Sequence, residues 1–186
     1  VPLEDLEREF SHTRIPLHFP EGRPNREPRD DIRITDRGAI IRAAAEDPGA
    51  AELVTRRWSW PAPNKGRVFN FGSDGGEFTS GRCLIVTDGF YEFTDAPAVE
   101  GGPKRPPKSK WLFTMRGAPW FCIAGVWRAE KSVGEAFTML TTQPRPDVAP
   151  YHDRQVVVLG RGDWARWLDP AIPAREILRP APAGTL

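Results

Sequence analysis

Three residues that lie far apart in the sequence carry side chains able to act together as an acid, a base and an orienting group: Asn70, Glu92 and His152. Glu92 lies between Tyr91 and Phe93 in the strand-like stretch CLIVTDGFYEFT. Side chains alternate along a strand, so Glu92 faces the opposite way from these two aromatic residues. If that face is buried, desolvation raises the pKa of the carboxyl group and suits it to proton transfer.

His152 lies where a proline-rich loop runs into a strand, with Asp153 and Arg154 directly after it. The following strand can hold the imidazole rigidly while the ring still faces a cleft. Asn70 lies among apolar neighbours in RVFNF, and a buried amide must find partners for its donors and its acceptor. The three side chains could therefore converge in one site.

Each of these residues also has a purely structural interpretation. Glu92 could sit on the solvent face of its strand, since glutamate is mostly exposed in proteins. His152 could be a hydrogen-bonded structural histidine, and Asn70 could mark a strand end or a turn. The combination of the three, rather than any one of them, favours chemistry.

Composition predicts the framework that must position these side chains. The chain has 186 residues with 20 prolines, 17 glycines, 10 phenylalanines and 7 tryptophans, which is typical of short strands and turns around an aromatic core. This length suits one domain, residues 1–186. The net charge of +1 means that any nucleic-acid site must be local.

The pattern along the chain predicts two helices and a series of strands. Leu3, Leu6 and Phe10 have helical spacing, and a second helix begins near Asp163, a plausible N-cap, with Trp164, Trp167 and Leu168 on one face. We expect a hairpin of 32–34 with 39–43, a kinked strand over 83–94 and a consecutive meander of 110–116, 121–128 and 135–142. Further strands are expected at 52–60, 67–71 and 155–159, with loops at 11–31 and, rich in lysine and arginine, at 95–110.

The cysteines and histidines argue against a metal site. Cys83 and Cys122 both lie in apolar runs, which predicts buried free thiols and suits a reducing cytoplasm. The three histidines are scattered without metal-ligand spacing. No apolar run is long enough to predict a membrane-spanning helix, and nothing resembles a signal peptide. We therefore expect a cytoplasmic protein without metal or cofactor.

Several segments together resemble one known family. GRCLIVTDGFYEF (81–93), LTTQPRPDVAPYHDRQVVVL (140–159) and DWARWLDP (163–170) look like the SRAP family, the SOS response-associated peptidases that act on abasic sites in single-stranded DNA. FNFGSDG (69–75) stands in the place of that family's Asn-Ala-Arg-Ser-Glu-Thr stretch. AGVWR (124–128) and the tryptophan-containing strand at 57–61 add support, in the family's order.

The resemblance implies an α+β fold: a single domain of mainly antiparallel strands forming a barrel-like body, with a few short peripheral helices. It implies a monomer that binds single-stranded DNA with abasic sites and is nucleoid-associated when bound. In the family an N-terminal cysteine, exposed by autoproteolysis, captures the abasic aldehyde as a thiazolidine. By resemblance Glu92 is the acid/base group, His152 moves protons on the sugar and Asn70 orients the nucleophile. The DNA-binding residues implied are Arg57, Trp58, Trp60, Ser73, Arg82 and Arg154.

The chain also departs from the family's pattern. It opens at Val1 without a Met-Cys-Gly-Arg start, so we expect a short segment carrying the cysteine to precede it. Gly72 stands where the family has a phosphate-binding arginine, and Trp58-Ser59-Trp60-Pro61 is shorter than the family's Trp-Gly-x-x-Pro. The alternative is thus a non-catalytic single-stranded DNA-binding module. An unrelated Glu/His hydrolase, acting on small molecules, would instead need a closed apolar pocket.

Overall fold

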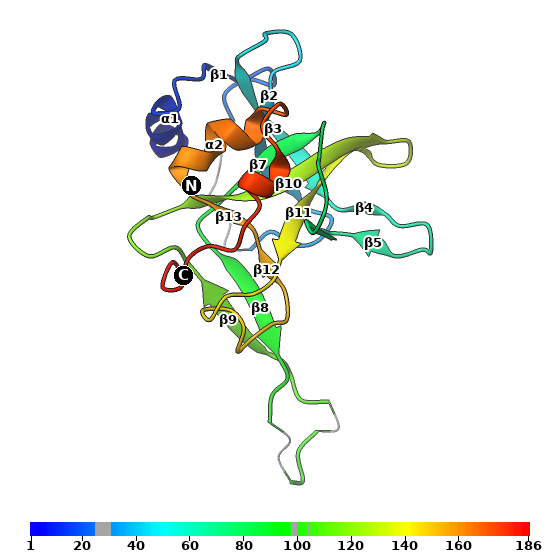
Figure 1. The fold of residues 1–186 in the computed structure, drawn as a ribbon. Helices are drawn as coiled ribbons and strands as arrows, with labels where there is room; N and C mark the ends of the chain where they lie inside the picture. The colour runs from blue at the N-terminus through cyan, green and yellow to red at the C-terminus, as the bar shows by residue number, and fades with distance from the viewer. Residues whose placement is uncertain (25–30, 98–99, 104) are drawn as a thin grey trace.

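A closed barrel of five strands forms the centre of the computed structural model (Figure 1). The strands follow each other around the barrel in the order β3-β2-β7-β10-β11, and a parallel pairing of β3 with β11 closes it. Their bounds are Arg37–Ala43 (β2), Ala51–Trp58 (β3), Arg82–Thr87 (β7), Phe121–Glu130 (β10) and Gly134–Thr142 (β11). The structure describes residues 1–24, 31–97, 100–103 and 105–186. The predicted barrel-like α+β body is confirmed.

Short strands extend the barrel wall. β1 (Leu17–His18) pairs with β3, β13 (Val158–Leu159) with β10, and both β6 (Asn70–Gly72) and β12 (Gln155–Val156) with β11. A separate small hairpin joins β4 (Trp60–Pro61) to β5 (Arg67–Val68). The edges of β11 therefore bring residues near 70 and 155 to the same part of the sheet.

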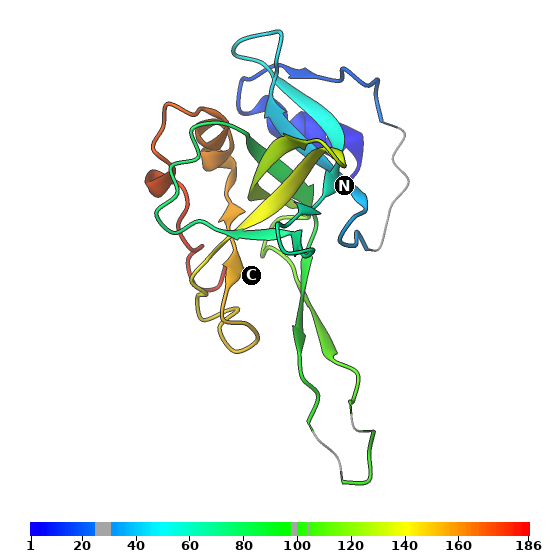
Figure 2. The same ribbon diagram turned by 90° about the vertical axis from the view of Figure 1, so that its right-hand side faces the viewer.

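β8 (Phe90–Thr94) and β9 (Ser109–Phe113) form a two-stranded ribbon of their own. Both views show this ribbon extending away from the barrel, with the connection between its strands at the far end (Figures 1 and 2). The chain leaves the barrel at Asp88-Gly89. A Cβ atom at Gly89 would lie 2.8 Å from Cδ1 of Leu112 and 2.9 Å from the carbonyl oxygen of Phe113, so this close approach requires glycine.

Helices cover one side of the barrel wall. α1 (Leu3–Ser11) and α2 (Arg161–Leu168), with a short 3₁₀ helix at Ala174–Glu176, bury large side chains against residues of β2, β3 and β7. Alternate residues of the same strands, such as Ile40, Val54 and Ile85, form a second cluster with Phe137 of β11, which fills the barrel interior. Trp164, Trp167 and Leu168, predicted to lie on one face of the second helix, are all buried.

Five element predictions are wrong. Residues 32–34 form no strand, and β2 pairs with β3 instead. The expected strand 83–94 divides between the barrel and the ribbon, and the first strand of the expected meander pairs with β8 rather than β10. The strand expected at 155–159 is divided between β12 and β13, and α2 begins after Gly160 rather than at Asp163. Local patterns predicted these strands, but tertiary pairing decided their partners.

Parts of two predicted loops lie outside the described residues: 25–30 in the loop 11–31, and 98–99 and 104 in the loop 95–110. Cys83 and Cys122 are both free and buried, as predicted. Burial raises the pKa of both thiols, which keeps them protonated and unreactive. Among the described helices, none is long and apolar enough to cross a membrane.

Candidate active site

Glu92 lies in the middle of the ribbon, on β8, directly opposite Trp111 of β9. Alternation places its side chain on the same ribbon face as Phe90, whose ring is buried and contacts Phe113 and Phe121. The opposite face carries Phe93, which is 48% exposed. Glu92 itself is half-buried, so the ribbon turns its carboxyl-bearing face toward the body of the protein.

His152 is positioned by a tight turn that ends at β12. The amides of Tyr151 and His152 both donate to the carbonyl of Val148, at 2.8 and 3.0 Å, and Val148 is fully buried. The Arg154 amide donates to Nδ1 of His152 at 3.0 Å. The same Nδ1 atom also lies 3.0 Å from the Arg154 carbonyl oxygen and 3.2 Å from Oδ1 of Asp153, so the turn holds the imidazole through this nitrogen.

The structure brings Glu92 and His152 together. Burial raises the pKa of the Glu92 carboxyl, the charge of His152 opposes that rise, and the charge of Asp153 adds to it. Charges act on the carboxyl in this way only from nearby, and the contact of the Trp111 and Tyr151 rings, 4.8 Å apart, brings the ribbon against this loop. A half-buried carboxyl group beside an imidazole has the composition of an acid/base pair.

Asn70 lies on β6 at the edge of the sheet, opposite Met139, and is exposed. Gly72 follows two residues later on the same face of the strand, and a Cβ atom there would lie 3.5 Å from Nη2 of Arg154. Asn70 therefore faces the same side as the Arg154 guanidinium. Within the described part of the chain, no hydrogen bond joins Asn70 to Glu92 or His152.

Arg154 lies between the strand that carries Asn70 and the loop that carries His152. Its Nη2 donates to the Thr141 carbonyl at 2.8 Å and to Oδ2 of Asp74 at 2.7 Å. It follows His152 by two residues and lies against Gly72. This guanidinium thus occupies the space into which a side chain at position 72 would extend.

Three of the predicted DNA-binding residues are structural instead. Arg82 is 5% exposed, lies over the ring of Trp167 and donates hydrogen bonds to backbone carbonyls. Trp60 is 4% exposed with the Arg128 guanidinium over its ring, and Ser73 is 7% exposed. The DNA-binding roles predicted for Arg82, Trp60 and Ser73 are therefore corrected to structural ones, because burial removes them from contact with a strand.

Arg57 and Trp58 remain partly accessible at the end of β3. The indole Nε1 of Trp58 donates to the Phe69 carbonyl at 2.9 Å, and the two rings meet edge to face. Phe69 and Phe71 are themselves 37% and 48% exposed. Exposed aromatic rings beside an arginine are the groups on which bases of single-stranded DNA stack.

Sequence reasoning missed Trp111 and Tyr151. Their rings lie 4.8 Å apart, between the strand opposite Glu92 and the residue before His152. Tyr151 had a usable signal, because a large aromatic residue directly beside a candidate catalytic histidine needs a packing partner. Trp111 had no such signal, since its pairing with Glu92 joins residues that lie far apart in the sequence.

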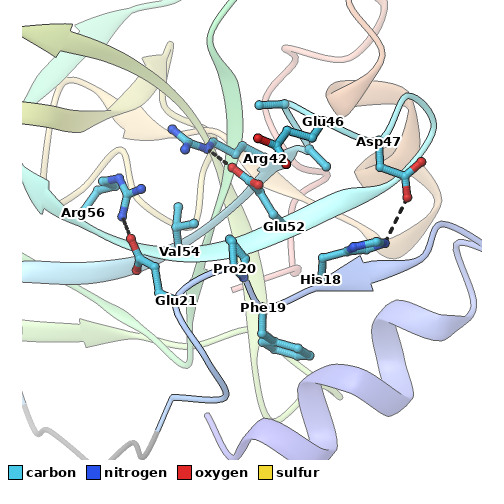
Figure 3. Close-up of a pocket in the computed structure, with 12 residues that line it drawn as sticks. His18, Phe19, Pro20, Glu21, Arg42, Glu46, Asp47, Glu52, Val54 and Arg56 are labelled. Carbon is cyan, nitrogen blue, oxygen red and sulfur yellow. Dashed lines mark hydrogen bonds and ion pairs between the residues drawn. The ribbon is translucent and has the colours of Figure 1, made fainter.

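Two hollows in the surface lie apart from Glu92 and His152. One, of about 460 Å³, is lined mainly by charged side chains from residues 18–21, 42–47 and 52–56 (Figure 3). The other, of about 230 Å³, lies beside Asp74, Thr142 and Arg175. Neither is a closed apolar pocket around Glu92 and His152. The described residues contain no group of side chains suited to bind a metal ion.

Comparisons with known proteins identify a matching family model and structures of similar fold. A family model described as SOS response associated peptidase (SRAP) matches residues 75–186. A protein of known structure from Bordetella bronchiseptica is 24% identical over 95% of this chain and 92% of its own, with a TM-score of 0.68.

Two further structures share the fold. A phage-related protein from Bordetella bronchiseptica is 25% identical, with a TM-score of 0.64 over 86% of this chain and 79% of its own. A protein from Bacteroides thetaiotaomicron is 19% identical, with a TM-score of 0.61 over 81% and 72%. No curated protein matches the chain.

Proposed function

This chain belongs to the SOS response associated peptidase (SRAP) family, and on that premise we propose that it processes abasic sites in single-stranded DNA. The observation that carries the proposal is the half-buried carboxyl of Glu92 beside the imidazole of His152. Ring opening of an abasic sugar exposes an aldehyde, and trapping that aldehyde requires proton transfers that such a pair can perform.

The reaction we propose is covalent capture by an N-terminal cysteine exposed by autoproteolysis, as the family resemblance implies. Its amine adds to the aldehyde carbon, water leaves as the carbon–nitrogen double bond forms, and the thiol adds to that carbon to close a thiazolidine. An α-amine has a pKa near 8, so a reactive neutral fraction exists at neutral pH. Glu92 in its protonated form would supply the proton for the departing water.

The remaining residues take roles that follow from their positions. His152 would exchange protons with the sugar through Nε2, since Nδ1 is already in contact with the Arg154 backbone and with Asp153. Asn70 would orient the nucleophile from the sheet edge. Arg154 would bind a phosphate of the strand, because its guanidinium lies against Gly72, where the family pattern has an arginine. Arg57 and Trp58 would hold the DNA strand beyond the phosphate bound by Arg154.

Incubation of the full-length protein with a single-stranded oligonucleotide bearing one abasic site tests the proposal. We expect a protein–DNA band that survives denaturation and that is lost in the Glu92→Gln variant. The same oligonucleotide without the abasic site is the control and should give no such band. A wild-type protein that binds the oligonucleotide but never forms the band would exclude covalent capture.

Gly72 favours a second candidate, a non-catalytic module that binds single-stranded DNA by the same surface. Loss of one phosphate contact lowers affinity and reduces the salt dependence of binding by about one counterion. This candidate predicts equal affinity for intact and abasic strands, with no covalent product. A Gly72→Arg variant that tightens binding of both strands without producing the band would support it.

A further inference from the structure

Aromatic rings join the β8–β9 ribbon to the loop that carries His152. Among the described strands, β8 and β9 pair only with each other, and no backbone hydrogen bond in the described chain links them to residues 145–155. The Tyr151 ring lies 4.8 Å from the Trp111 ring and 5.2 Å from the Phe113 ring. Tyr151 thus packs against the ribbon face that presents Glu92.

Both members of the acid/base pair lie one position away from this contact. Glu92 is the cross-strand partner of Trp111, and His152 directly follows Tyr151. The indole Nε1 of Trp111 donates to Oγ1 of Thr94 at 2.9 Å, which fixes its ring on the same ribbon face. A change in the contact between the two rings is therefore transmitted directly to the separation of carboxyl and imidazole.

We propose that Tyr151 is a positioning residue, whose ring holds the ribbon against the loop and so sets the distance between Glu92 and His152. This inference rests on the proposed function of that pair. A two-stranded ribbon is only marginally stable without further packing, so it needs such a clamp to hold one position. The contacts are ring to ring, so the aromatic ring and not the phenolic hydroxyl is required.

The electrostatics of Glu92 provide a readout for the clamp that is independent of activity. The titratable groups that act on its carboxyl, His152 and Asp153, both belong to the loop that Tyr151 packs against the ribbon. Burial is the largest influence and raises its pKa. If the ribbon separates from the loop, water reaches the carboxyl and its pKa falls toward that of an ordinary glutamate.

Tyr151→Leu and Tyr151→Phe in the full-length protein test the proposal. We expect Tyr151→Phe to match the wild type. Tyr151→Leu should lower the Glu92 pKa, followed by carboxyl ¹³C NMR, and slow covalent capture by about 10²-fold, the loss expected for a misplaced catalytic group. Affinity for the oligonucleotide should stay within about twofold, because neither variant alters the phosphate-binding side chains.

A folded Tyr151→Leu protein that keeps both the wild-type Glu92 titration and the wild-type capture rate would overturn the inference. If Tyr151→Leu does not fold, Thr94→Val provides the second variant, since it frees the Trp111 ring and should move the Glu92 pKa in the same direction. If the wild type forms no covalent product, the proposed function fails, but the Glu92 titration still decides whether Tyr151 positions the carboxyl.

Discussion

At the scale of single residues, the protonation of Glu92 links activity to stability. Its pKa is raised in the folded protein, mainly by burial, so the folded state holds this proton more tightly than the unfolded chain does. The stabilising effect of that proton is complete below the unfolded-state pKa and is lost as pH rises through the folded-state pKa. Above the folded-state pKa, an ionised Glu92 therefore lowers the free energy of unfolding, as is common for catalytic groups.

Glu92→Gln should reduce covalent capture by about 10²-fold to 10⁴-fold, because it removes the proton donor while keeping the shape of the side chain. The same change should raise the free energy of unfolding relative to the wild type at about pH 8 and bring little gain at about pH 4. Capture kinetics and denaturant unfolding at the two pH values measure both effects. Asp153→Asn is the matched control and should keep most of the capture rate.

Ser59 is a second residue that by itself lowers the stability of the fold. Its φ angle is 88°, a region that suits glycine, and its buried hydroxyl has no hydrogen-bond partner among the described residues. Ser59→Gly should therefore raise the free energy of unfolding by about 1 kcal/mol. This gain is the backbone strain that glycine relieves, reduced by the greater conformational entropy that glycine gives the unfolded chain. Urea unfolding measures this gain. Ser59→Ala removes only the hydroxyl, so a larger gain from alanine than from glycine would contradict the strain argument.

At the scale of elements, Arg82 joins segments that backbone pairing leaves separate. From β7 its guanidinium reaches the carbonyls of Glu77 and Phe78 on one side and of Asp169 and Ile172, after α2, on the other. Burial lowers the pKa of Arg82, but an arginine in this position stays charged. The planar fork of donors, rather than the charge alone, holds these segments together.

Arg82→Leu should lower the free energy of unfolding by about 3 kcal/mol, because it leaves several inward-facing carbonyls without donors. Thermal and urea unfolding measure this loss. Oligonucleotide affinity per folded molecule should be unchanged. Arg154→Leu is the matched comparison, because it should weaken binding of single-stranded DNA and reduce its salt dependence while costing less stability. A stable Arg82→Leu protein with weakened DNA binding would restore the role first predicted for Arg82.

At the scale of the whole molecule, a network of charged side chains connects strands of the barrel, and Figure 3 shows its Arg42–Glu52 and Arg56–Glu21 pairs. Arg42 pairs with Glu52 across β2 and β3 at 2.7 Å, and Arg56 pairs with Glu21 and with Glu135 of β11. The Arg42 guanidinium also lies 4.0 Å over the Trp127 ring. The network spans β3 and β11, the two strands whose parallel pairing closes the barrel.

This network makes the barrel sensitive to acid. Burial alone would raise the pKa of Glu135, but hydrogen bonds and charge from Arg56 and Arg42 outweigh it and hold that pKa below its usual value. The stability that Glu135 contributes is therefore present at neutral pH and lost as pH falls through its folded-state pKa. Glu135→Gln should cost about 2 kcal/mol at neutral pH and less near pH 4.

Urea unfolding at the two pH values measures this difference. Glu130→Gln is the control, because the Arg128–Glu130 pair lies outside the network, and its cost should stay below about 1 kcal/mol. An equal loss for both variants at neutral pH would show that Glu135 contributes no more than a surface ion pair. The outcome does not depend on DNA, so it tests the fold separately from the function.

The sequence alone determined the features that depend on local pattern. Helical spacing located α1 and the apolar face of α2, strand-like residue patterns located the barrel strands, and the apolar runs around Cys83 and Cys122 predicted buried thiols. The motifs around Glu92 and His152 also indicated the family. These signals lie within a few residues of one another, and so neighbouring side chains suffice to encode them.

Only the tertiary structure decided which segments meet. The sequence around Gly89 indicated a kink but not that β8 would leave the barrel and pair with β9. Nor did an arginine next to a strand reveal that Arg82 points into the protein while Arg154 reaches Gly72. Strand partners and burial depend on contacts between residues far apart in the chain, and local propensity does not specify those contacts.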